Sequence, residues 1–144
     1  MDTSYNQRNR EQTERLKTLS RLTDAELARP MGEHWTVAVA LAHLAYYDAR
    51  VLSTLDASLR HGVPRYWWNG PEALAVNDAR LDGWRALSPR ETLDQAIQIA
   101  EAVDRFIATL PDDFAETILD ERPSALDRSR HRAEHLDEVD AALT

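Results

Sequence analysis

His131 and His135, two histidines four residues apart near the end of the chain, have the residue type and spacing to bind a metal ion. On a helix, side chains at positions i and i+4 lie on one face, about 5–6 Å apart at their Cβ atoms. Two imidazoles at that separation can share one divalent ion, as in the helical His-x-x-x-His of zinc enzymes. A pair is an incomplete site, so a third ligand must come from another segment.

The candidate for the third ligand is His43, in a helix expected from Thr36 to about Arg60. At 100° per residue His43 falls on the flank of that helix's apolar stripe, so we expect it to line a groove between helices. Three neutral imidazoles suit a divalent ion and leave coordination positions for water or substrate. Such an ion lowers the pKa of a bound water or thiol towards neutrality. The alternative is that the terminal helix, rich in Arg and Asp, is a solvated face. His34 and His61 are not assigned to the site.

Other side chains could complete a site around the histidines. Glu134 lies between His131 and His135 and is a candidate general base. Tyr47 and Arg50 follow His43 by one or two helical turns, and Arg50 could bind a substrate carboxylate or pair with a surface acid. A predicted loop that contains Gly62, Pro64 and Gly70 also carries three aromatic residues, Tyr66, Trp67 and Trp68. These aromatic side chains could either form an apolar pocket wall or fill one end of a bundle.

His131-Arg-Ala-Glu134-His135 also has the form His-x-x-Glu-His of inverted zinc peptidases. In that class a further carboxylate ligand lies well downstream, in a much larger domain. Only nine residues follow His135 here, which argues against a peptidase.

Composition limits the classes of function. The 144 residues, 43% hydrophobic and 29% charged, are typical of one soluble globular domain, which we assign to residues 1–144. A formal net charge of −8 argues against nucleic acid as a partner. No segment is apolar enough to span a membrane, and the first residues lack the apolar core of a signal peptide, so we expect a cytoplasmic protein. The chain has no cysteine, so a thiol used here must arrive as a small molecule.

Helical periodicity dominates the whole chain. Helix start signals stand at Thr23, with Glu26 completing a capping box, at Thr36, and at Ser88-Pro89. The patterns predict helices over residues 3–21, 36–60, 71–87, 88–110 and 124–143, a loop at 29–34, and a partly extended connector over 112–123. We see no strand-like alternation. The expected fold is all-α, a four-helix bundle with short additional helical turns.

Two segments of the chain resemble signatures of a known family. Trp35-Thr-Val followed by Leu41-Ala-His43-Leu, and the ending His131-x-x-x-His135-Leu-x-x-Val139, are similar to signatures of the DinB/YfiT-like superfamily of four-helix-bundle metalloproteins. Relatives include the N-terminal domain of mycothiol-dependent maleylpyruvate isomerase and the bacillithiol transferases. The resemblance implies that His43, His131 and His135 are metal ligands, with zinc or nickel as the ion. It also implies a low-molecular-weight thiol such as mycothiol as co-substrate.

Two functions of different class are therefore expected. The first is a metal-dependent enzyme acting on a small-molecule substrate, as a thiol-dependent S-transferase or isomerase, or a hydrolase. The second is a non-catalytic metal- or ligand-binding or dimerisation bundle with a weakened site. The second function is considered because the segment Glu121–Arg130 is more polar than the family pattern at the same place. A homodimer through an apolar helix face is expected by resemblance.

Overall fold

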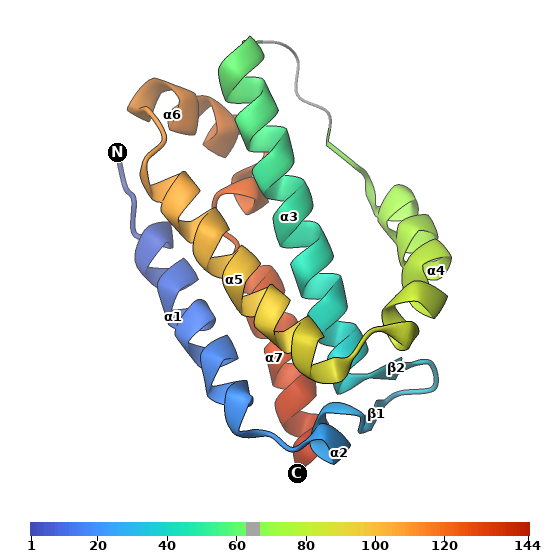
Figure 1. Ribbon diagram of the computed structural model, residues 1–144. Coiled ribbons are helices and arrows are strands. Elements are labelled where there is room, and N and C mark those ends of the chain that lie inside the picture. The colour runs from blue at the N-terminus through green and yellow to red at the C-terminus, as the bar shows by residue number, and fades with distance from the viewer. Residues whose placement is uncertain (63–66) are drawn as a thin grey trace.

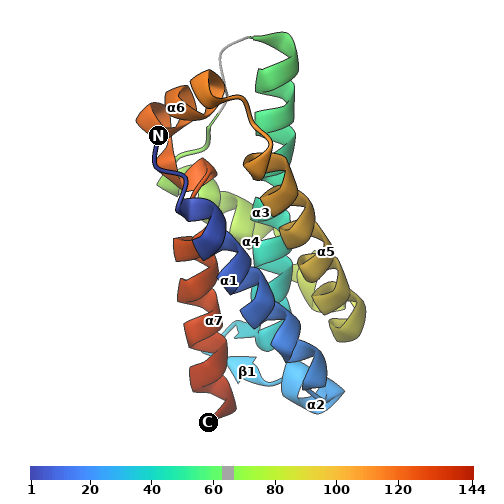
Figure 2. The same ribbon diagram turned by 90° about the vertical axis from the view of Figure 1, so that its left-hand side faces the viewer.

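Four long helices form the bundle that positions the three histidines. A computed structural model describes residues 1–62 and 67–144. The bundle helices are α1 (Tyr5–Thr18), α3 (Val37–His61), α5 (Pro89–Ala108) and α7 (Ser129–Leu143). They run side by side in both views (Figures 1 and 2), and α3 packs most extensively against α5.

Smaller elements cover the side and the ends of the bundle. Helix α4 (Gly70–Ala86) lies beside α3, and α6 (Asp112–Glu121) lies at the end where the chain starts (Figure 1). The opposite end, where the chain finishes, carries the short helix α2 (Asp24–Leu27) and the strands β1 (Pro30–Met31) and β2 (Trp35–Thr36). Two 3-10 turns, η1 (Leu19–Arg21) and η2 (Pro123–Ala125), complete the described elements.

The helix starts follow the predicted signals. Thr23 and Glu26 form a reciprocal capping box at α2. The Thr36 side chain accepts a hydrogen bond from the Val39 N–H at 3.1 Å, and Ser88 caps α5 with Pro89 at its first position. These caps satisfy backbone N–H groups that the first helical turn leaves without partners. The predicted starts of α2, α3 and α5 are thus confirmed.

Two predictions about secondary structure were wrong, and a third was incomplete. The connector at 112–123 is mostly helix α6, because the acids Asp112 and Asp113 favour a helix N-terminus and Ile118 gives the helix an inner face. The predicted loop at 29–34 does turn at residues 32–34, but Pro30–Met31 pairs with Trp35–Thr36 as an antiparallel hairpin whose strands are too short to show alternation. The last helix begins at Ser129 rather than near residue 124, because the chain first makes the turn η2.

The core consists of clusters of apolar side chains between the helices, one towards the hairpin and one towards α6. Towards the hairpin it includes Leu27, Leu41 and Leu136, and towards α6 it includes Leu55, Ile107 and Ile118, all at most 2% exposed. On α4, Leu74 is 68% exposed, whereas Trp84 is buried against Val39 and Ala42 of α3. None of the helices in the described part of the chain is long and apolar enough to cross a membrane.

Candidate metal centre

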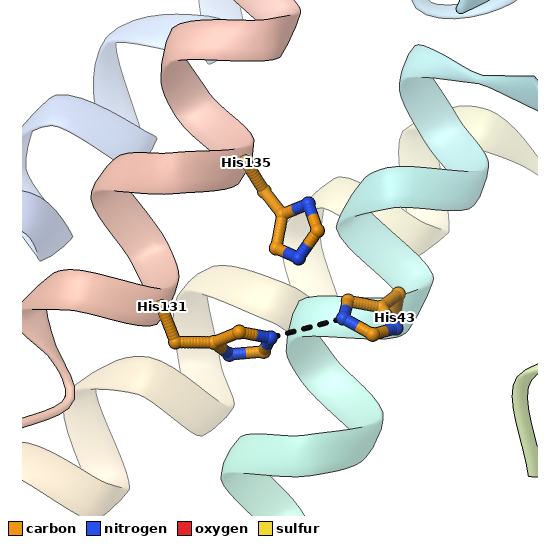
Figure 3. A group of neighbouring side chains, drawn as sticks. All are labelled: His43, His131 and His135. Carbon is orange, nitrogen blue, oxygen red and sulfur yellow. Dashed lines mark hydrogen bonds between the residues drawn. The ribbon is translucent and has the colours of Figure 1, made fainter. Parts of the chain in front are cut away.

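The three predicted ligands converge from two helices. His43 lies on α3, and His131 and His135 lie one turn apart on the facing side of α7 (Figure 3). One nitrogen from each ring lies within 4.8 Å of the others. The ring centroids are 4.5 to 5.0 Å apart, and the Nε2 atoms of His43 and His131 are 2.9 Å apart. The i, i+4 spacing on α7 therefore does place two imidazoles opposite the third.

A directed chain of hydrogen bonds orients two of the rings. Arg128 Nη2 lies 3.2 Å from His131 Nδ1, and a guanidinium can only donate, so this Nδ1 accepts. A neutral His131 then carries its proton on Nε2, and this N–H donates a hydrogen bond to Nε2 of His43. His43 in turn donates from Nδ1 to Oδ1 of Asn77, on α4, at 3.2 Å. The His43 lone pair at Nε2 thus faces the centre of the cluster.

Burial keeps these imidazoles neutral. It lowers the pKa of His43 to about 3, assisted by the neighbouring His135 ring. Burial also lowers the pKa of His131 to about 2, with further contributions from Arg128 and the other two histidines. A metal ligand must be a neutral imidazole, so at neutral pH His43 and His131 are already in the protonation state that a cation needs.

The residues present fit a divalent ion by their chemistry. Three imidazoles are the donor set of many zinc sites, and they also suit nickel, copper and iron. His135 directs its Nε2 toward the other two rings (Figure 3), while its buried Nδ1, on the far side of the ring, makes no hydrogen bond within the described chain. Oε2 of Glu138 lies 3.6 Å from this Nδ1, beyond hydrogen-bond length.

The sequence as a whole agrees with this site. The family model of the DinB superfamily matches residues 6–138, a range that includes all three histidines. The chain belongs to the DinB superfamily. Comparisons with curated proteins and with solved structures found no match.

Aromatic rings enclose the histidines of this DinB-superfamily chain. Trp35, on β2, stacks on His135 with ring centroids 5.9 Å apart and also contacts His43 at 5.0 Å. Trp84, on α4, meets His43 edge-on at 5.9 Å, and Tyr47 lies one turn along α3 at 4.8 Å. The short hairpin and α4 thus each supply a wall of the site, which keeps bulk water from most of the cluster.

A buried ionic network holds α7 in place behind the histidines. Asp48, on α3, accepts from Nε of Arg128 at 2.9 Å and from Nε of Arg132 at 3.1 Å. Arg132 also donates to Asp104, on α5, at 2.8 Å and to Thr13, on α1, at 3.0 Å. Arg132 is 1% exposed and Asp48 2%. One arginine of α7 therefore ties all four bundle helices together, and Arg128 joins the same network to the ring of His131.

The polar segment before α7 is docked by α1. The side chain of Asn9, fully buried, donates to the Leu126 carbonyl at 2.8 Å and accepts from the Arg128 N–H at 2.9 Å. Asp127 accepts from Arg8 at 2.8 Å and from the Ser129 N–H at 3.2 Å. The polar groups of this segment therefore attach it to α1 by hydrogen bonds.

A pocket of about 240 Å³ opens beside two of the three histidines. It is lined by His43, Tyr47, Trp68, Ala73, Arg122, Ser124, Arg128 and His131. His43 and His131 form one part of the lining, and Trp68, Ala73 and Tyr47 supply apolar surface. No carboxylate is among these lining residues.

The other predicted site residues have different positions. Tyr47 and Trp68 line the pocket, whereas Trp67 packs against Trp68 with ring centroids 6.1 Å apart. Arg50 lies over the Trp68 ring at 4.6 Å and is not among the lining residues. Glu134 is exposed on α7, and its catalytic role stays a prediction. Tyr66 lies outside the described residues.

Several functional neighbours were not predicted from sequence. Asn77 and Trp84 lie on α4, far from any histidine in the chain, and nothing in their local pattern marks them. Arg128 and Arg132 looked like part of a solvated face. Their spacing, four residues apart and in register with His131 and His135, is a signal that could have placed one of them behind the site.

Proposed function

We propose that this DinB-superfamily protein is a divalent-metal-dependent enzyme that uses a low-molecular-weight thiol, such as mycothiol, in S-transfer to a small molecule or in its isomerisation. His43, His131 and His135 would hold the ion, zinc or nickel. The observation that carries the proposal is the convergence of three imidazoles, with one nitrogen of each within 4.8 Å of the others, beside a pocket that two of them line. Three protein ligands are the usual number in catalytic zinc sites, which keep a position open.

A bound divalent ion supplies Lewis acidity that lowers the pKa of a thiol or water towards neutrality. The chain's own residues do the positioning. Asn77 fixes the ring of His43 through its Nδ1–H, and Trp35 stacks on His135. Tyr47 and Trp68 present apolar surface to the molecule in the pocket and exclude water around it.

The composition of the pocket supports a thiol reaction over a hydrolysis that uses a side-chain base. Hydrolysis of that kind needs a carboxylate or a free imidazole within hydrogen-bond reach of the attacking water. No carboxylate lines the pocket among the described residues, and its two histidines are proposed ligands. The chain has no cysteine, so the thiol must be a separate molecule.

The second candidate is a metal-binding bundle without catalysis. The observation that favours it is the size of the pocket, about 240 Å³, because typical ligand pockets hold roughly 300–1,000 Å³. A bundle of this kind would bind the ion and leave little room for two co-substrates.

The test is to load untagged protein with Co²⁺ and titrate it with N-acetylcysteine. We expect a sulfur-to-metal charge-transfer band in the near ultraviolet that saturates at one thiol per chain. The band should be lost in His131→Ala and kept in the control His34→Ala, whose side chain is 71% exposed. Bound cobalt without any such band at saturating thiol would contradict the thiol-dependent function and leave the second candidate.

A further inference from the structure

The pocket beside the histidines contains a positive charge that no described acid neutralises. Two arginines line it, Arg122 and Arg128. Arg128 is paired with Asp48 at 2.9 Å, and both side chains are at most 5% exposed. Arg122 makes no ion pair with any residue that the structure describes, and its guanidinium lies 5.4 Å from the centroid of the Trp68 ring.

Arg122 is one of two half-buried arginines that make no ion pair within the described part of the chain, and of these two it is the one that lines the pocket. The chain carries 25 acidic and 17 basic side chains, and the other described arginines without a carboxylate partner are all exposed to solvent except Arg50. Arg122 is half-buried directly after α6, so its guanidinium is partly removed from water without a compensating acid. Such an arrangement costs free energy unless a ligand supplies the missing charge.

We propose that Arg122 binds the carboxylate of the small molecule that enters this pocket, with the apolar part of that molecule against Trp68, Tyr47 and Ala73. This assignment rests on the proposed function, because it names the substrate class of the same site. It makes Arg122 the residue that selects an acid over its neutral analogue. Trp68 holds the guanidinium by its ring face and also forms part of the apolar wall.

The charge and the volume favour a small monocarboxylate. A planar guanidinium matches a carboxylate through two parallel hydrogen bonds. One free positive charge balances one carboxylate, whereas a phosphate dianion would leave a negative charge beside the apolar wall. The volume of 240 Å³ equals the liquid volume of about eight water molecules, at roughly 30 Å³ each, which admits a ring or short chain bearing one acid group.

The experiment compares phenylacetate with phenylacetamide, which have the same shape and differ in charge. Binding to metal-free protein is measured by NMR titration, so that the acid cannot bind through an ion. We expect wild type to bind phenylacetate at least tenfold more tightly than phenylacetamide. In Arg122→Gln the ratio should fall to about one, while the control Arg130→Gln, at an exposed position of α7, should keep it.

Two further arms keep the assignment falsifiable. Arg122→Lys retains the charge without the planar fork, and we expect part of the preference to survive, which separates loss of recognition from misfolding of Arg122→Gln. Inorganic phosphate should bind more weakly than phenylacetate. Equal binding of acid and amide by wild type, an unchanged ratio in Arg122→Gln, or tighter binding of phosphate would each overturn the assignment.

Zinc binding is measured separately on the same variants. It distinguishes failure of the carboxylate-binding role of Arg122 from failure of the proposed metal-dependent function. Zinc bound without any acid preference would refute the role of Arg122 and leave the metal site intact. An acid preference that depends on Arg122 in a protein that binds no zinc would refute the metal-dependent function and uphold the carboxylate site.

Discussion

The proton on Nε2 of His131 is the group that an incoming cation has to replace. In the structure Arg128 donates to Nδ1 of this ring, which leaves Nε2–H pointing at His43. A cation bound at Nε2 requires the neutral ring to carry its proton at Nδ1 instead, where the guanidinium of Arg128 cannot accept it. Arg128 therefore opposes metal binding by hydrogen-bond direction as well as by charge.

Replacement of Arg128 by Gln should change two properties in opposite directions. The glutamine carbonyl can accept from Nδ1–H and carries no charge, so we expect zinc affinity to rise several-fold. The free energy of unfolding should fall by about 1–3 kcal/mol, because Asp48 loses one of its two arginines. Calorimetric titration with zinc and urea denaturation measure the two effects. A loss of zinc affinity in a folded variant would contradict this account.

Asn77 should matter through His43. The amide oxygen fixes the ring by accepting from Nδ1–H at 3.2 Å, and loss of such a partner typically lowers metal affinity by 10–100-fold. We expect a loss in this range for Asn77→Ala and recovery in Asn77→Asp, which can still accept. Asp78→Ala, at the exposed next position of α4, is the matched control. Equal zinc affinity in Asn77→Ala and wild type would exclude a positioning role.

Stability of the metal-free protein should fall as the pH falls below about 6.5. Burial lowers the folded-state pKa of His43 to about 3 and of His131 to about 2, from an ordinary value of 6.5. Between these values the unfolded chain binds more protons, so acid favours unfolding, by up to about 1.4 kcal/mol per pH unit for each histidine. Above pH 6.5 this contribution is fully present.

Urea denaturation between pH 7.5 and 4.5 checks this slope. We expect His131→Gln to reduce it, while His34→Gln, at an exposed loop position, should leave it unchanged. The same slope in wild type and His131→Gln would show that this histidine does not titrate as its burial implies.

At the scale of elements, α7 depends on a single arginine for its position. Arg132 contacts Asp48 on α3, Asp104 on α5 and Thr13 on α1, so it joins α7 to the other three helices. Removing one partner of a buried ionic network leaves uncompensated charge, which typically costs about 3–5 kcal/mol. We expect this loss for Arg132→Met in urea denaturation, with less than about 0.5 kcal/mol for the exposed Arg130→Met. A small effect of Arg132→Met would mean that water or a shifted Arg128 replaces it.

Elements with strong local signals were predicted well, and those set by tertiary contacts were not. The caps at Thr23, Thr36 and Ser88 use hydrogen bonds within four residues, so the sequence contains all the information they need. Helix α6 was missed because Pro111 and Pro123 dominate the local pattern, although Ile118 is buried in the core. The hairpin β1–β2 places Trp35 on His135 through a ladder of two residue pairs, which no periodicity can show.

At the scale of the whole molecule, the ligands were predictable and their surroundings were not. His131 and His135 are related by helical geometry, and His43 was predicted from its place beside the apolar stripe of its helix and by the family resemblance. Asn77 reaches His43 across 34 residues, and Arg132 reaches Asp48 across 84. Such contacts depend on how the helices pack. An arginine whose charge is neutralised inside the bundle looks the same in sequence as one on a solvated surface.

The most direct test of the metal centre is the zinc stoichiometry of untagged protein, measured by calorimetric titration of wild type and His131→Ala. The account predicts one zinc ion per chain in wild type, with no detectable site in His131→Ala and an unchanged site in His34→Ala. Bound zinc should also stabilise wild type and His34→Ala, but not His131→Ala, by about 2.7 kcal/mol at a free concentration 100 times Kd. A folded wild-type protein that binds no zinc, nickel or cobalt, or binds them equally well without His131, would contradict the central claim.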